Sequence, residues 1–303
     1  MNVFVAGGSG AIGVPLVRAL LAAGHQVTAL TRSAANADVL RGLGATPAIG
    51  DALDAEALRR AVVAARPTHV IHQLTALPKG GPRSARELGP TNRLRTEGTR
   101  HLIAAAVAAH AQRIIIGSFA MFRGVAPADA PPDVREAAEA VTSMEQQTIE
   151  ATRDGRIEGM VLRYGLFYGP LAGSTVQMIA MARRRMLPRI RHDHSLLPCI
   201  HVDDAASATV AALDHGQPGA VYDIVDDRAV SFSDIVGALA KASGAPDPIA
   251  IPAWIPRLVM PYMARMIAMR VPLSNAKAKA ELGWRPAYAT IDEGLAQTLR
   301  RAA

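Results

Sequence analysis

Hydrophobic and polar positions follow two alternating patterns along the first two thirds of the chain. Short runs rich in Val, Ile and Ala predict buried strands, and longer segments with apolar residues three and four positions apart predict helices. The predicted strands are Val3–Ala6, Gln26–Leu30, His69–Leu74, Arg113–Gly117, Gly159–Arg163 and Ala220–Val225, with a short strand before Gly50. The predicted helices are Ala11–Ala23, Ala55–Ala65, Thr91–Ala109, Arg135–Ala151 and Asp203–Leu213. This alternation predicts an α/β fold, a doubly wound parallel sheet of the Rossmann type.

The first predicted strand runs directly into a glycine-rich turn that opens a helix. Glycines at this spacing allow a tight turn, close approach of the backbone to a phosphate, and close packing of the helix on the sheet. The free amide groups and the positive end of the helix dipole then face the anion. We therefore predict that Gly7, Gly10, Ala11, Ile12 and Gly13 bind the pyrophosphate of a dinucleotide. The alternative is a glycine-rich surface turn.

The residues after the second strand bear on the choice of cofactor. An acidic residue here usually binds the adenosine ribose of NAD, but no acid occurs before Asp38. Arg32 offers a guanidinium to a 2′-phosphate and Ser33 a hydroxyl, so we predict NADP(H), with NAD(H) less favoured. A solvated surface arginine is the alternative. Asp51 is placed either to contact the adenine or to cap a helix, and Leu74, at the end of the fourth strand, is a further predicted cofactor contact.

Composition limits the remaining possibilities. The 303 residues are 50% hydrophobic with a single cysteine, which predicts a globular protein without an internal disulfide. We expect a cytoplasmic protein, since the start resembles no signal peptide. The net charge of +7 comes from scattered arginines with few aromatic residues, so we expect no nucleic-acid partner. The apolar stretch Trp254–Val271 is broken by arginines and prolines, so we expect no membrane span.

The last third of the chain predicts a smaller lobe. We expect residues 1–165 to form the Rossmann domain, with residues 199–226 returning to it, and residues 166–198 and 227–303 to form a substrate lobe. Four methionines recur at every third position, which predicts one helical face for the lobe core, a subunit contact or an apolar pocket: Met260, Met263, Met266 and Met269.

Several motifs occur in the order found in one known family. Arg163–Pro170 reads Arg-Tyr-Gly-Leu-Phe-Tyr-Gly-Pro, Ile200–Ala205 reads Ile-His-Val-Asp-Asp-Ala, and Leu282–Pro286 reads Leu-Gly-Trp-Arg-Pro. With the glycine turn, these resemble the extended short-chain dehydrogenase/reductases, the NAD(P)-dependent epimerase/dehydratase family, over nearly the whole chain. Each motif also has a structural interpretation: Asp203 or Asp204 can cap a helix, and the Gly-Trp-Arg-Pro turn can serve packing.

The resemblance implies an active site, and the sequence departs from it. The family uses a Ser or Thr after the fifth strand, which Ser118 matches, and a Tyr-x-x-x-Lys on the next long helix. No tyrosine precedes Tyr164, and no lysine lies between Lys79 and Lys241. Glu145 resembles the glutamate that follows the family motif, which places Ala137 and Val141 where the Tyr and Lys would stand. The usual proton relay is therefore missing.

Other residues are candidates to replace that pair. Tyr164 is the first, because its segment resembles the one that passes the nicotinamide, although packing is the alternative for a tyrosine at a strand end. Arg123 could polarise an oxygen, and His201 could exchange protons or make a structural hydrogen bond. Two histidines around Asp193 lack the further ligands of a zinc site, so we expect no metal.

These observations lead to three hypotheses. The first is an atypical NADP(H)-dependent oxidoreductase for a small, largely apolar carbonyl or alcohol substrate, with Ser118 and Tyr164 as candidate catalytic residues. The second is a non-catalytic NADP(H)-binding sensor or scaffold. The third is a sugar-nucleotide epimerase or dehydratase that uses the basic segment Arg183–Arg191. The resemblance also implies a homodimer formed by two long helices, including Arg135–Ala151.

Overall fold

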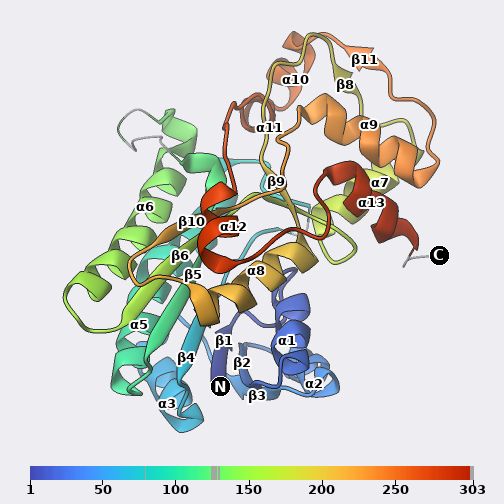
Figure 1. The fold of residues 1–303 in the computed structure, drawn as a ribbon. Coiled ribbons are helices and arrows are strands. Elements are labelled where there is room, and N and C mark those ends of the chain that lie inside the picture. The colour runs from blue at the N-terminus through green and yellow to red at the C-terminus, as the bar shows by residue number, and fades with distance from the viewer. Residues whose placement is uncertain (79, 124–127, 129, 301–303) are drawn as a thin grey trace.

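A parallel sheet of seven strands forms the centre of the protein in the computed structural model, which describes residues 1–78, 80–123, 128 and 130–300. The strand order is β10-β6-β5-β4-β1-β2-β3 (Figure 1). The strands are β1 (Asn2–Ala6), β2 (Gln26–Thr31), β3 (Thr46–Ile49), β4 (His69–His72), β5 (Arg113–Phe119), β6 (Glu158–Tyr164) and β10 (Val221–Ile224). The predicted doubly wound Rossmann sheet is confirmed.

Helices cover both faces of this sheet, as the apolar strands require. One face carries α1 (Gly13–Ala22), α2 (Ala34–Leu43), α8 (Val202–His215) and α12 (Ala276–Leu282). The other carries α3 (Ala55–Ala65), α5 (Thr99–Ala108) and α6 (Pro132–Arg153). Successive residues of β5 supply the two cores in turn: Ile115 packs on the α1 side, whereas Ile114 and Ile116 pack on the α5 side. Neighbouring side chains of a strand therefore serve opposite faces.

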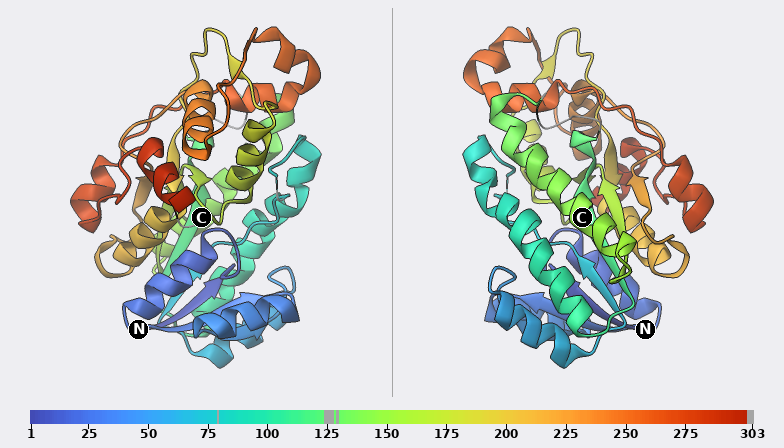
Figure 2. Two further views of the ribbon diagram at one scale, coloured as in Figure 1. Left: turned by 90° about the vertical axis from the view of Figure 1, so that its right-hand side faces the viewer. Right: turned by 90° about the vertical axis from the view of Figure 1, so that its left-hand side faces the viewer.

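A smaller set of elements lies beyond the carboxyl ends of the strands (Figures 1 and 2). Its helices are α7 (Gly173–Arg183), α9 (Phe232–Ser243), α10 (Trp254–Val259), α11 (Pro261–Ile267) and α13 (Ile291–Arg300). Its short strands pair in parallel, β7 (Leu166–Tyr168) with β9 (Cys199–His201) and β8 (Arg189–Ile190) with β11 (Ala250–Ile251). We call these elements the upper lobe.

The helix predicted over Thr91–Ala109 is less regular than its pattern indicates. The chain forms a short 3-10 turn η1 (Ala85–Leu88), then α4 (Gly89–Arg93), a π-helical turn η2 (Leu94–Gly98) and α5. A π turn inserts one extra residue into an α-helix and is frequent at functional sites. It changes which side chains of this segment face α6.

The continuous methionine face predicted around Met260 is wrong. The chain breaks at Met260 between α10 and α11, because Pro261 cannot continue the preceding helix. Met260 is exposed, Met263 and Met266 pack near α6, and Met269 packs with the core of the upper lobe. The four side chains thus serve different surroundings.

No helix in the described part of the chain is long and apolar enough to cross a membrane. The apolar stretch Trp254–Val271 is divided between the short helices α10 and α11.

Candidate functional site

The glycine turn between β1 and α1 leaves no room for side chains at two of its positions. Gly7 has a φ of +98°, and an added Cβ would lie 2.6 Å from the carbonyl oxygen of Gln73. A Cβ on Gly13 would lie 2.1 Å from the carbonyl oxygen of Gly7. These contacts hold the amino end of α1 against the turn, with Gly10, Ala11 and Ile12 between them. The turn therefore fits a dinucleotide pyrophosphate, as its sequence predicts.

The end of β2 presents the two residues predicted to select NADP(H). Arg32 is exposed, and the described residues give it no hydrogen bond or ion pair. Ser33 is the N-cap of α2, where its hydroxyl oxygen accepts a hydrogen bond from the Asn36 amide. Because that contact uses only the oxygen, the Ser33 hydroxyl proton can still be donated. The two side chains and the amino end of α2 together offer donors to a phosphate.

The other two predicted cofactor contacts lie along the same edge of the sheet. Asp51 follows β3, and one of its oxygens accepts a hydrogen bond from the Leu53 amide, so it organises its own turn. Leu74 follows β4, and its amide nitrogen would lie 3.1 Å from a Cβ on Gly7. Leu74 is thus adjacent to the glycine turn. The contacts of both residues with a cofactor remain predictions.

Ser118 belongs to a largely buried polar cluster between β5, β6 and α6. Its hydroxyl donates to Oε1 of Glu145 at 2.6 Å. Arg163 donates to the same carboxylate through Nε at 2.8 Å and Nη2 at 2.5 Å. The Glu145 hydrogen bond raises the pKa of Arg163, so the guanidinium stays charged. In this arrangement the Ser118 proton points to Glu145, and its oxygen is left as an acceptor.

Tyr164 lies on the opposite face of the sheet from Ser118. Ser118 pairs with Arg163 across β5 and β6, and Phe119 pairs with Tyr164, so the pleat separates the two candidate catalytic side chains. The Tyr164 hydroxyl accepts from Gln73 Nε2 at 2.9 Å and lies 2.6 Å from Thr209 Oγ1. Burial raises the pKa of this phenol to about 12. The structure does not bring Ser118 and Tyr164 together, and gives Tyr164 the contacts of a core residue.

The helix surface where the family resemblance places Tyr and Lys is apolar and covered. Ala137 and Val141 are buried in one cluster with Leu88 and Phe122, and Tyr262 of α11 packs into the same cluster. A side chain from the upper lobe thus contacts the face of α6 from which the usual pair would extend. We call this group of residues the α6–α11 cluster.

Sequence reasoning missed Arg95, a buried cation beside the α6–α11 cluster. Its guanidinium carbon lies 6.0 Å from the centre of the Phe119 ring, one residue after Ser118. Burial lowers the pKa of Arg95 to about 10, so it remains protonated at neutral pH. The signal was present in the sequence, because Arg95 stands seven residues before Leu102 in the helix predicted over Thr91–Ala109, a spacing that puts it on the apolar side.

Three other candidate residues have structural contacts. Arg123 forms an ion pair with Asp223 at 3.1 Å. His201, rather than either following aspartate, is the N-cap of α8, where its Nδ1 accepts from the Asp203 amide. The Asp204 carboxylate accepts from two backbone amides of the segment after Trp284, at Ala287 and Tyr288. Trp284 itself is buried, which confirms the packing role expected of its turn.

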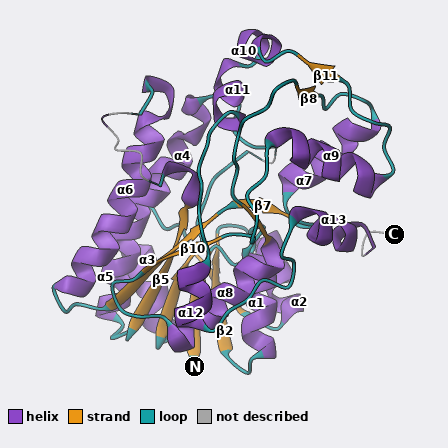
Figure 3. Ribbon diagram, turned by 45° about the horizontal axis from the view of Figure 1, so that its top comes forward, coloured by secondary structure: helices purple, strands orange, loops and turns teal. Residues whose placement is uncertain are grey.

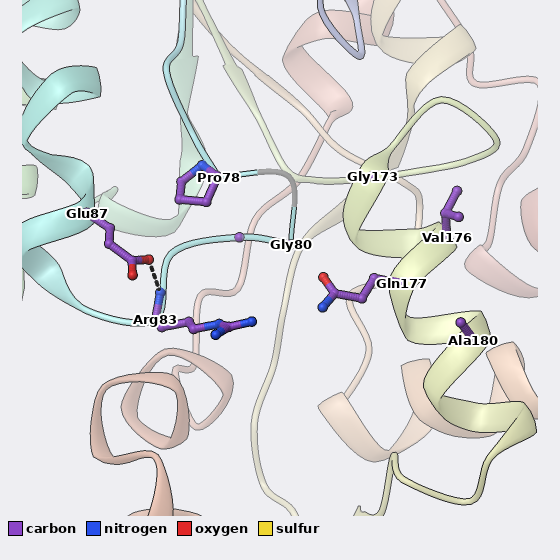
Figure 4. Close-up of a pocket in the computed structure, with 9 residues that line it drawn as sticks. Pro78, Gly80, Arg83, Glu87, Gly173, Val176, Gln177 and Ala180 are labelled. Atoms are coloured by element: carbon purple, nitrogen blue, oxygen red, sulfur yellow. Dashed lines mark hydrogen bonds between the residues drawn. The ribbon is translucent and has the colours of Figure 1, made fainter.

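A cavity of about 830 Å³ opens between the two parts of the molecule (Figure 4). The segment after β4 supplies one wall, including Pro78 and Arg83, and α7 of the upper lobe supplies the other, including Val176 and Gln177. The volume is in the range of small-molecule sites. In Figure 3 the strands of the large sheet end below this region, where ligands of parallel sheets bind.

Comparison with known proteins identifies the family. The model of the NAD dependent epimerase/dehydratase family matches residues 3–225. The chain belongs to this family. It is therefore an NAD(P)-binding protein of the oxidoreductase and epimerase type, in agreement with the glycine turn and the sheet order.

Relatives of the chain within this family include several reductases. The chain is 37% identical over 310 residues to a 3-diazoavenalumate denitrifying reductase from Streptomyces sp, covering 97% of this chain and 99% of the relative. It is 27% identical over 262 residues to a 2-alkyl-3-oxoalkanoate reductase from Stenotrophomonas maltophilia, covering 81% and 77%. The UDP-glucose 4-epimerase of Thermus thermophilus, solved with NAD, shares the fold with a TM-score of 0.78 at 24% identity, covering 99% and 98%.

Proposed function

We propose that the protein is an NADP(H)-dependent reductase that acts on a small, largely apolar substrate without a Tyr-Lys proton relay. The observation that carries this proposal is the α6–α11 cluster, in which Ala137 and Val141 are buried under Tyr262. The cofactor turn keeps its glycines while this helix face has no polar group at either position. A site of this kind favours a reaction that needs hydride transfer more than proton delivery.

The cofactor residues follow from the geometry of the sheet edge. Gly7, Gly10 and Gly13 hold the pyrophosphate, and Arg32 with Ser33 holds the 2′-phosphate that distinguishes NADP(H) from NAD(H). NADPH, when bound, supplies the hydride. We assign this half of the site to residues 1–165 with residues 199–226, and the substrate half to residues 166–198 and 227–303.

The missing relay favours a substrate whose reduction creates no alkoxide. A carbonyl becomes an alkoxide on receiving hydride and must then be protonated, which is the task of the usual tyrosine. An aromatic diazonium carbon differs: the C–H bond forms as the C–N bond breaks, and dinitrogen leaves with the electron pair of that bond. No proton is required. The 37% identity to a reductase named for denitrifying a diazo compound supports this substrate class.

A ketone is the second candidate substrate, because two relatives are named as an oxoalkanoate reductase and a ketoreductase. A ketone would need a proton donor other than Tyr164, whose hydroxyl is enclosed by Gln73 and Thr209. The polar cluster of Ser118, Glu145 and Arg163 is the candidate partner of the carbonyl oxygen, and Ser118 would donate to that oxygen by turning its hydroxyl proton away from Glu145.

The first test of this proposal is a pair of calorimetric titrations with NADPH and NADH. We expect the protein to bind NADPH about tenfold or more tightly than NADH, because a charge-assisted hydrogen bond from Arg32 to the 2′-phosphate contributes a binding free energy of this size. Arg32→Ala should remove this preference. Arg18→Ala is the matched control, because Arg18 is exposed on α1. Equal affinity for both cofactors, unaffected by Arg32→Ala, would refute the assignment of NADP(H).

The second test distinguishes the substrate classes. The protein is supplied with NADPH deuterated at the transferring position and with either benzenediazonium or acetophenone, and product deuterium is measured by mass spectrometry. We expect deuterium at the carbon that carried the diazonium group, above a control without protein. Deuterium only in the alcohol from acetophenone would favour the ketone. Tight NADPH binding without turnover of either would favour the sensor or scaffold hypothesis.

A further inference from the structure

Arg95 is the feature of the site that the proposed function leaves unexplained. It lies in the π-helical turn η2, it is only 7% exposed, and burial opposes its charge. Among the described residues, no carboxylate or other acceptor forms a hydrogen bond or ion pair with its guanidinium. Its contact is the face of Phe119, at 6.0 Å. A buried cation with no counter-ion among the described residues costs stability, which a bound anion would restore.

The surroundings of Arg95 place it where the two parts of the molecule meet. Phe119 follows Ser118 at the carboxyl end of β5, where parallel sheets bind their ligands. Tyr262 of α11 belongs to the α6–α11 cluster, against which Phe119 packs, so the upper lobe meets the ring that the Arg95 guanidinium faces. The environment of the Arg95 guanidinium is therefore mainly apolar, because it is formed by Phe119 and the neighbouring α6–α11 cluster.

A second buried polar group on the same helix also lacks a partner. Neither the oxygen nor the nitrogen of the Asn92 side-chain amide has a hydrogen-bond partner in the described part of the structure. Asn92 lies near the end of α4 and precedes Arg95, in the π turn, by three residues along the chain. Both are buried. This segment therefore holds a guanidinium and an amide for which the described residues supply no hydrogen-bond partner.

We propose that Arg95 binds an anionic oxygen of the substrate, a carboxylate or a phenolate on an otherwise apolar, aromatic body. The guanidinium supplies the positive charge and two parallel N–H donors, the Asn92 amide adds a donor, and Phe119 packs against the apolar body. The proposal rests on the proposed function, since it names the substrate class of that reductase site. It also gives the substrate site a fixed cation in place of the missing lysine, at a position on a neighbouring helix.

Equilibrium binding of simple probes tests this assignment. The NADP⁺-saturated protein is titrated with benzoate and with benzamide, which share a shape and differ in charge, and with 4-nitrophenolate and 4-nitroanisole as the phenolate pair. We expect at least one anion to bind about tenfold or more tightly than its neutral analogue, the effect of a charge-assisted hydrogen bond. The benzoate and nitrophenolate arms distinguish a carboxylate from a phenolate.

Three variants then locate the effect. Arg95→Met keeps the length of the side chain without its charge and should abolish the preference for the anion, whereas Arg95→Lys should retain part of it. Arg100→Met is the matched control, because Arg100 is exposed on the same helical segment, and it should bind as the wild type does. Circular dichroism and NADPH titration show that each variant is folded and holds cofactor.

The outcomes separate this proposal from the proposed function. Anion binding that Arg95→Met leaves unchanged, or a wild type with no preference for either anion, overturns the role of Arg95. In both cases NADPH binding and hydride transfer can still be present, and the reductase assignment then stands. Failure to bind NADPH overturns the reductase assignment, while the probe titrations repeated without cofactor still report on Arg95.

Discussion

Replacement of Asp226 by Asn should change how the stability of the protein depends on pH. Asp226 follows β10 and is 4% exposed. One carboxylate oxygen accepts a hydrogen bond from the Tyr168 hydroxyl at 2.9 Å, and the other has no partner among the described residues. Burial, with a smaller contribution from the charge of Asp204, raises the pKa of Asp226 from 3.8 to about 8. The folded protein therefore holds a proton that the unfolded chain releases.

The sign of the effect follows from that difference in bound protons. Between pH 3.8 and about 8 only the folded state is protonated at Asp226, so the free energy of unfolding falls as pH rises. The slope is about 1.4 kcal/mol per pH unit while this holds. Asp226 is half-ionised at about pH 8. Between about pH 6.5 and about pH 8 the free energy of unfolding of the wild type should therefore fall by about 1.5 kcal/mol more than that of Asp226→Asn.

Urea unfolding at several pH values over this range measures the difference. Groups that titrate in both proteins cancel when the two curves are subtracted. The Asn side chain can still accept the Tyr168 hydrogen bond, so the main change is the removal of the ionisation. Parallel pH profiles for the wild type and Asp226→Asn would show that Asp226 is already ionised in the folded protein at about pH 6.5, and would refute the reasoning from burial.

Three further predictions concern the site and the sheet. Gly13→Ala should lower the free energy of unfolding by about 3 kcal/mol or more and abolish cofactor binding, because its Cβ would lie 2.1 Å from a backbone oxygen. Gly42→Ala is the control: this position lies in open space on α2, so the substitution should raise the free energy of unfolding by about 0.5–1 kcal/mol, and urea unfolding measures both variants. Ser118→Ala should cost about 1–3 kcal/mol, since it removes a hydrogen bond to the charged Glu145, and an unchanged urea midpoint would contradict that contact. Burial lowers the pKa of His72 from 6.5 to about 4. The contribution of the neutral imidazole to the free energy of unfolding is therefore complete above pH 6.5, and about 3 kcal/mol of it is lost as the pH falls towards 4. His72→Gln should flatten this acid loss in paired unfolding curves, and equal slopes would show that the imidazole is not desolvated.

The sequence by itself determined the elements that depend on local pattern. Apolar strands such as Arg113–Gly117 and helices such as Ala55–Ala65 follow from hydrophobic periodicity, and the helix at Ala55–Ala65 has those bounds in the structure. The glycine turn was equally readable, because the close contact between Gly7 and Gly13 involves residues six positions apart. The resemblance of the ordered motifs to one family added the expected active site and exposed the absence of its Tyr and Lys.

Only the tertiary structure decided which side chains meet at the site. Periodicity places Ser118 and Tyr164 near the ends of adjacent strands, but the register of β5 and β6 puts them on opposite faces of the sheet. Arg95 and Tyr262 come together because α11 of the upper lobe packs against α6, a contact between distant segments that no local pattern encodes. Burial, which sets the pKa of a cation or a phenol, is a property of that packing and not of the residue type.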